Sequence, residues 1–151
     1  MSHIETGLTT LTLTTLAEAL RQGDGVAVAQ NPCLVLLRQA VALVAKEQQG
    51  SVGTTYLDYN LHPQAVNTNL ALRIRRKLPR GIGLEIDLET GALTFKGDPW
   101  QVDKVFYAGL QQAIVQKYVV LAQVAALRRM HAQVSTQTIE DQVVITGVLH
   151  G

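Results

Sequence analysis

The side chains with the clearest chemical potential in this sequence form a basic cluster in the segment LRIRRKLPRG. It contains Arg73, Arg75, Arg76, Lys77 and Arg80. Such a run can hold a phosphate group or a nucleic-acid backbone. Surface charges more often pair with carboxylates or stay solvated, and no aromatic residue interleaves with this run to stack on bases. We therefore expect carboxylate partners for Arg73 and Arg75, and we name Arg76, Lys77 and Arg80 as possible anion contacts.

Two carboxylates flank the chain's single tryptophan in the segment GDPWQVDKVF. Asp98 and Asp103 could form an acid/base pair, but nothing in their spacing indicates the converging geometry that such a pair needs. Asp98, Pro99 and Gln101 also match the N-cap, N1 and N3 positions of a helix. We favour the helix start, and we assign no catalytic residue.

Other catalytic and metal-binding signatures are missing from the sequence. The single cysteine, Cys33, excludes an internal disulfide and a paired-cysteine site. The four histidines have no metal-ligand spacing. Phosphate-loop, dinucleotide-binding and nucleophile-elbow motifs do not occur. We predict no metal, identify no cofactor, and incline towards a protein that is not an enzyme.

Most aromatic residues lie between residues 95 and 118. Their concentration predicts that the C-terminal helix docks on a sheet there, with Trp100 closing the edge of the core. An alternative is that Trp100, Tyr107 and Tyr118 form a contact surface or line a pocket between the helix and the sheet.

Two hairpins are expected to position the basic cluster. Residues 70–76 and 84–89 alternate apolar and charged side chains, as half-buried strands do. An antiparallel register with a turn near Arg80 places Arg73 opposite Asp87 and Arg75 opposite Glu85. The same register pairs the apolar side chains Leu72 with Leu88 and Ile74 with Ile86. A second turn at Gly91 places Leu88 opposite Leu93 and Ile86 opposite Phe95.

The N-terminal half is predicted from shorter patterns. Residues 7–13 read as a strand, followed by a short helix in which Thr15 and Glu18 form a capping box and Gly23 ends the helix. The segment GVAVAQ reads as a strand. Residues 33–50 fit a helix or a buried strand, with helix slightly favoured. A further strand is expected within VGTTYLDYNL.

The C-terminal half is predicted to consist of a long helix and a hairpin. Apolar residues repeat at intervals of three and four after Trp100, which indicates an amphipathic helix that runs towards LRRMHAQ. The segments VSTQTI and QVVITGVL are expected to form a final hairpin, with its turn at Glu140 and Asp141. Exposed edges of the terminal strands can pair between chains.

Four segments carry a resemblance to a known family: MSHIETGLTTLT, IGLEIDLETGALTF, DPWQVDKVFYAGLQQAIVQKY and QTIEDQVVITGVL. In this order they resemble a small uncharacterised family encoded in algal plastid genomes, cyanobacteria and some other bacteria, as hypothetical chloroplast open reading frame products. The resemblance covers residues 1–22 and 69–149. The chain departs from it in a longer 24–65 region and in QKYVV where the family has a tyrosine-rich segment. It implies a plastid-type or bacterial cytoplasmic protein with no assigned reaction.

Length and composition favour one soluble domain over residues 1–151. The chain is 47% hydrophobic and 17% charged, with a formal net charge of +1. The start lacks a signal-peptide pattern, and the most apolar run is interrupted by Arg38 and Gln39. We predict no membrane association and a cytoplasmic or stromal location. The fold class is α+β: an antiparallel sheet of about five or six strands, with a long C-terminal helix on one face and a short N-terminal helix.

These observations support three hypotheses about function. The leading one is a non-enzymatic binding or assembly factor that acts through a protein partner or self-association. The alternative is a small-molecule or cofactor-binding domain, which an enzyme could also use, with a pocket between the helix and the sheet. The weakest is nucleic-acid binding through the basic cluster, because the net charge of +1 supplies no long-range attraction.

Overall fold

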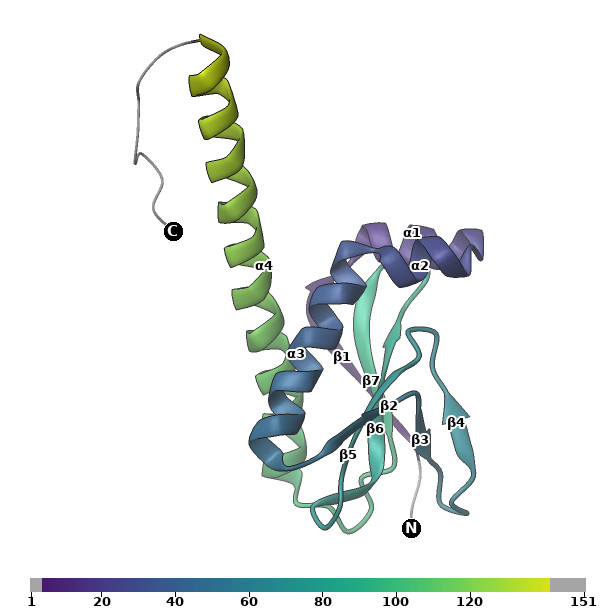
Figure 1. The fold of residues 1–151 in the computed structure, drawn as a ribbon. Helices are drawn as coiled ribbons and strands as arrows, with labels where there is room; N and C mark the ends of the chain where they lie inside the picture. The colour runs from purple at the N-terminus through teal and green to yellow at the C-terminus, as the bar shows by residue number, and fades with distance from the viewer. Residues whose placement is uncertain (1–3, 142–151) are drawn as a thin grey trace. The chain divides into compact units, whose positions relative to one another are not determined.

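The structure, a computed structural model, describes residues 4–141 (Figure 1). The chain divides into two compact units, Met1–Tyr118 and Val119–Gly151. The sheets, three helices and the first part of a fourth belong to the first unit.

A five-stranded antiparallel sheet organises the first unit, with strand order β1-β7-β6-β5-β2. Its strands are β1 (Glu5–Thr12), β2 (Ser51–Gly53), β5 (Leu70–Ile74), β6 (Leu78–Ile86) and β7 (Ala92–Gly97). A separate two-stranded sheet pairs β3 (Thr55–Leu57) with β4 (Pro63–Ala65). The predicted N-terminal strand is therefore confirmed, and it lies at an edge of the larger sheet.

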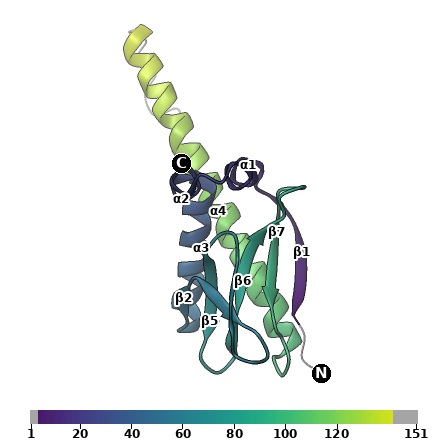
Figure 2. The same cartoon turned by 90° about the vertical axis from the view of Figure 1, so that its right-hand side faces the viewer.

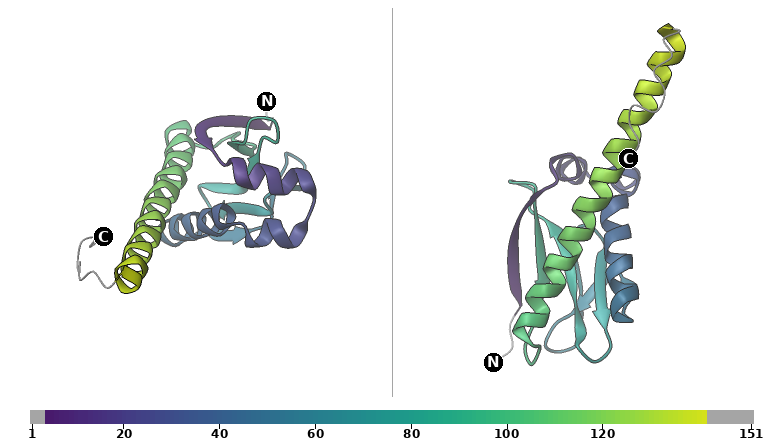
Figure 3. Two further views of the ribbon diagram at one scale, coloured as in Figure 1. Left: turned by 90° about the horizontal axis from the view of Figure 1, so that it is seen from above. Right: turned by 90° about the vertical axis from the view of Figure 1, so that its left-hand side faces the viewer.

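The helices are α1 (Thr14–Gln22), α2 (Gly25–Gln30), α3 (Pro32–Gln48) and α4 (Lys104–Asp141). Within the first unit, α3 and the first part of α4 lie on the same face of the sheet (Figures 2 and 3). An ion pair of 2.7 Å between Glu47 on α3 and Lys117 on α4 joins the two helices. The α+β class and the antiparallel sheet with a long C-terminal helix are confirmed.

The opposite face of the sheet is covered by the β3–β4 hairpin, which lies in front of the sheet in Figure 2. Gly83 in β6 makes this packing possible, since a Cβ atom there would lie 2.7 Å from Val66 Cγ1 and 2.8 Å from Tyr56 Cδ1. Both of these side chains are buried. The absence of a side chain at Gly83 therefore sets how closely the hairpin sits on the sheet.

The core between the sheet and the helices consists mostly of aliphatic side chains, with a few aromatic rings among them. Leu72, Ile82, Leu84 and Phe95 from the sheet are buried, and Ile114 on α4 is fully buried. The alternation of buried leucines and isoleucines along β5 and β6 matches the face predicted for them.

Between residues 24 and 50 the chain forms two helices, α2 and α3, which Asn31 separates. The helix favoured for residues 33–50 is therefore confirmed as α3. The Asn31 side chain accepts a hydrogen bond from Cys33 N, and Pro32 occupies the first turn of the helix. The strand predicted for GVAVAQ is wrong. The Asp24 carboxylate accepts hydrogen bonds from Val26 N and Ala27 N, and this cap starts α2 despite the β-branched valines.

The predicted capping box on α1 is also wrong. The N-cap residue is Leu13 and it makes no side-chain cap, while Glu18 pairs with Arg21 and accepts a hydrogen bond from Gln22. Gly23 ends the helix in the left-handed conformation, with φ of 73°, as predicted.

The predicted register of the first hairpin is wrong, because the turn falls at residues 75–77 rather than near Arg80. Leu72 lies opposite Ile82, and Leu70 lies opposite Leu84. Residues 78–81 continue β6, with an irregularity that Gly81 accommodates at φ of 82°. Since the new register differs by an even number of residues, the apolar side chains keep their face.

The second hairpin is displaced by two residues from the prediction. Ile86 lies opposite Leu93, and Leu84 lies opposite Phe95. The changed register of the first hairpin removes the predicted charge pairs Arg73–Asp87 and Arg75–Glu85. Glu85 forms its ion pair with Lys96 instead.

The start of α4 differs from the prediction as well. The helix begins at Lys104, and the Asp103 carboxylate accepts a hydrogen bond of 2.9 Å from Phe106 N. Asp103, rather than Asp98, is therefore the residue that caps this helix.

The segment VSTQTI, predicted as a strand, lies in α4, which continues to Asp141. No glycine or proline occurs between residues 110 and 141, so the sequence contains no strong helix terminator there. The other half of the predicted hairpin, residues 142–149, lies outside the described residues.

Candidate protein-contact surfaces

Trp100 belongs to an exposed cluster with Tyr59 and Arg80, which we call the aromatic cluster. The Tyr59 and Trp100 rings meet edge to face, with centroids 6.2 Å apart. The Arg80 guanidinium carbon lies 5.3 Å from the Tyr59 ring centroid and 5.5 Å from that of Trp100. Tyr59 is 58% exposed and Trp100 is 41% exposed. Stacking and cation–π contacts thus fix two large aromatic side chains at the surface.

A buried ion pair anchors the aromatic cluster to the sheet. Arg80 Nη1 donates to Asp98 Oδ2 at 2.8 Å, and the Asp98 side chain is fully buried. The other carboxylate oxygen of Asp98 accepts a hydrogen bond of 3.1 Å from Trp100 N. Asp98 therefore orients Arg80 and the tryptophan backbone together. Gln101, next to Trp100, is held at φ of 63°.

Tyr59 is positioned by a loop built around Asp58. The Asp58 carboxylate accepts hydrogen bonds of 2.9 Å from Asn60 N and His62 N, and one of 3.0 Å from Gln64 Nε2. Leu61 in this loop has φ of 63° and is 61% exposed. A leucine in the left-handed region is uncommon, so the hydrogen bonds of Asp58 hold the loop in one specific shape.

This arrangement suits contact better than catalysis. Tryptophan, tyrosine and arginine are the residue types that contribute most to protein interfaces, particularly when they are held rigidly. The Asp98 carboxylate is engaged by Arg80 and by Trp100 N, so it is not placed as the acid/base partner that the sequence also suggested. The sequence pointed to Trp100 and Arg80 as contact residues, but it did not predict that Tyr59 lies beside them, because only tertiary structure brings these residues together.

The other predicted contact or pocket residues lie elsewhere. Tyr107 and Tyr118 are buried, and a Cβ atom on Gly97 would lie 2.8 Å from the Tyr107 hydroxyl oxygen. Burial raises the pKa of the Tyr118 phenol, and a hydrogen bond with Cys33 raises it further. Cys33 Sγ also lies 3.4 Å from Thr15 Oγ1, within hydrogen-bond reach. Neither tyrosine joins Trp100 in the aromatic cluster.

Arg76 and Lys77, predicted as anion contacts with Arg80, lie in the turn between β5 and β6 and are exposed. Lys77 Nζ lies 5.1 Å from the centroid of the Phe106 ring. Arg80 faces the aromatic cluster instead, so the structure does not unite the three residues in one site.

The second unit contains an apolar segment of α4, Val119–Met130, which we call the apolar helix segment. Every residue from Val119 to Leu127 except Gln123 is apolar. Several of its large side chains are exposed: Val120 by 56%, Leu127 by 46% and Met130 by 49%. A helix that is apolar around most of its circumference is normally covered in its working state. None of the described helices is both long and apolar enough to cross a membrane.

Among the residues that the structure describes, no group of three or more histidine, cysteine, aspartate or glutamate side chains could hold a metal ion. Comparison with known proteins gives no further assignment: no family model matches the chain, and it matches no curated protein and no solved structure. The predicted membership of the plastid and cyanobacterial family therefore stays a prediction.

Proposed function

We propose that this protein is a binding or assembly factor without a catalytic role, which self-associates through the apolar helix segment. The observation that carries the proposal is the exposure of Val120, Leu127 and Met130 in and beside a stretch, residues 119–127, whose only polar residue is Gln123. Apolar area removed from water contributes about 25 cal/mol per Å², so covering these side chains favours association.

The binding partner that best fits the apolar helix segment is a second copy of the chain. Val120, Val124 and Leu127 follow one another at intervals of four and three residues, the spacing of a two-helix seam. An identical helix supplies the same seam, so each copy covers the other. Arg128 and Arg129 follow the seam and are exposed, which keeps this end of the segment hydrated.

The aromatic cluster supports a further contact with a protein partner in the same assembly role. Its two aromatic rings are exposed and already held in place, so binding there costs little side-chain entropy. We also propose a cytoplasmic or stromal location and a plastid-type origin for this protein.

The test is the molar mass of the full chain in solution, measured by size-exclusion chromatography with light scattering. We expect the wild type to be a dimer or larger, and Leu127→Glu and Val124→Glu to be monomers with unchanged circular dichroism of the β-sheet. Gln133→Glu is the matched control, since it adds a charge to the same helix outside the seam. A wild type that is monomeric at high protein concentration would refute self-association.

The small-molecule hypothesis stays a prediction. The cavities beside the α3–β2 connection and the β5–β6 turn are not lined by Trp100, Tyr107 or Tyr118, the residues on which the predicted pocket rested.

A further inference from the structure

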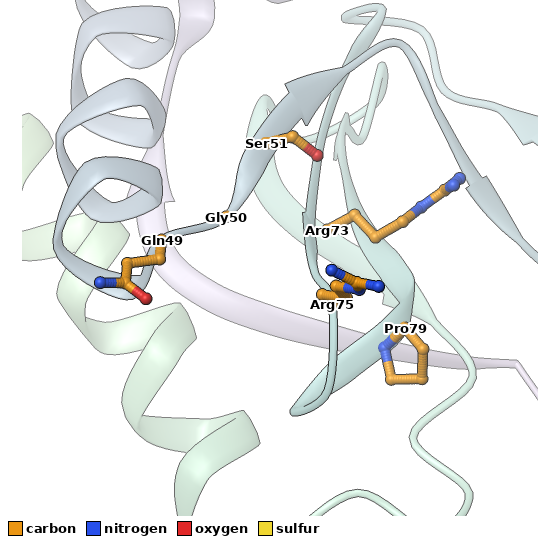
Figure 4. Close-up of a pocket in the computed structure, with 6 residues that line it drawn as sticks. All are labelled: Gln49, Gly50, Ser51, Arg73, Arg75 and Pro79. Carbon is orange, nitrogen blue, oxygen red and sulfur yellow. The ribbon is translucent and has the colours of Figure 1, made fainter.

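A basic cavity of about 440 Å³ lies where α3 passes into β2 (Figure 4). It is lined by Gln49, Gly50, Ser51, Arg73, Arg75 and Pro79. A neighbouring cavity of about 550 Å³ shares Gln49 and Arg75 with it and adds Arg76 and Lys77. We call the first of these the basic cavity. Both lie within the first unit of the chain.

Backbone geometry brings residues that line the basic cavity together. Ser51 in β2 is the Cα partner of Arg73 in β5, so the two residues are direct cross-strand neighbours. Gly50 lets the α3–β2 connection approach β5 closely, since a Cβ atom there would lie 2.7 Å from the Arg73 carbonyl oxygen. Figure 4 shows Ser51 and Arg73 on adjacent strands with Arg75 below them, the Arg73 side chain extending away from the other two, and Gln49 at the far end of the connection.

The charges of this region are not balanced by nearby carboxylates. Glu47, which lines the neighbouring cavity, is paired with Lys117 at 2.7 Å. Glu85, the partner expected for Arg75, is paired with Lys96. Among the side chains that the structure describes, no carboxylate forms an ion pair with Arg73, Arg75, Arg76 or Lys77.

We propose that the basic cavity binds the phosphate group of a small ligand, with Arg73 and Arg75 as the charged donors and the Ser51 hydroxyl as a third donor. The planar guanidinium group offers parallel N–H donors whose spacing matches two oxygens of a phosphate. A phosphate dianion also supplies the negative charge that the region lacks. This site is independent of the proposed self-association, which uses the second unit.

The size and lining of the cavity favour a small ligand over a nucleic acid. A volume of about 440 Å³ falls within the usual range of small-molecule sites. No aromatic side chain lines the cavity, so bases would have no surface on which to stack.

The test uses the full chain and isothermal titration calorimetry with inorganic phosphate, followed by glycerol phosphate as a simple monoester. We expect saturable binding of both. Arg75→Gln and Arg73→Gln should each weaken binding by about tenfold or more, because a hydrogen bond to a charged group is lost. Arg38→Gln is the matched control, since this exposed arginine lies on α3 and does not line the cavity.

Several results would overturn the proposal. One is the absence of heat with either phosphate compound at millimolar concentration, and another is equal weakening by Arg38→Gln. Malonate binding as tightly as inorganic phosphate would show that the cavity does not select phosphate. A single-stranded oligonucleotide that binds more tightly than glycerol phosphate, with a steep dependence on salt, would contradict the assignment to a small ligand.

Discussion

The aromatic cluster and the basic cavity both use arginines from the segment LRIRRKLPRG, but they place them in opposite electrostatic settings. Arg80 is largely buried and is paired with the fully buried Asp98. Arg75 is exposed and has no described carboxylate partner. A run of like charges in sequence need not act as one site. Arg80, on β6, stabilises the fold, whereas Arg73, on β5, and Arg75, in the turn at residues 75–77, line the basic cavity.

The sharpest test of this comparison is Arg80→Gln against Arg75→Gln. Removing Arg80 leaves Asp98 buried without its charge partner, and we expect a loss of about 3 kcal/mol in the free energy of unfolding. Arg75→Gln should change it by no more than about 0.5 kcal/mol, as for other surface positions. Urea denaturation measures both, and similar values for the two variants would show that the arginines do not differ as the structure indicates.

Gly50→Ala tests the geometry of the basic cavity. The added methyl group would lie 2.7 Å from the Arg73 carbonyl oxygen, a backbone atom that cannot rotate away. We expect a loss of about 1–3 kcal/mol in unfolding free energy, as for overpacked sites. Gly53→Ala is the control, because a Cβ atom there would meet nothing within 4 Å. An equal effect at both glycines would mean that the close approach at Gly50 is not a constraint.

Trp100→Ala should have the smallest effect on stability among the variants that are expected to destabilise. Its ring is 41% exposed, so its contribution is mainly the contacts with Tyr59 and Arg80, each worth on the order of 1 kcal/mol or less. We expect a loss of about 1 kcal/mol by thermal denaturation, with Val105→Ala, an 83% exposed position, as a near-neutral control. A loss as large as that of Arg80→Gln would instead identify Trp100 as a residue of the core.

Periodicity in the sequence was enough to predict the faces of β5 and β6, but not their register. Leu72 points to the core whether it lies opposite Leu88 or Ile82, because both alignments preserve the alternation. The position of the turn decided between them. Residues 78–81 contain proline, arginine and glycine, which read as a turn in isolation, yet tertiary packing extends β6 through them.

Local capping signals were likewise ambiguous between neighbouring aspartates. Asp98 and Asp103 both precede residues that can start a helix, and the structure uses Asp103 for that purpose. Asp98 is buried because Arg80, distant in sequence, supplies its countercharge. Tyr59 could not be placed beside Trp100 from sequence, although Asp58 and Asn60 around it are typical of a tight turn.

The position of Tyr59 in the aromatic cluster depends on Gly83, an interior residue of β6. The hairpin that leads to Tyr59 rests on the bare backbone at this position, against Tyr56 and Val66. A side chain at Gly83 would lift the hairpin and move Tyr59 relative to Trp100 without altering either residue. Recognition by this protein could therefore diverge between related chains through a single substitution that no partner ever touches.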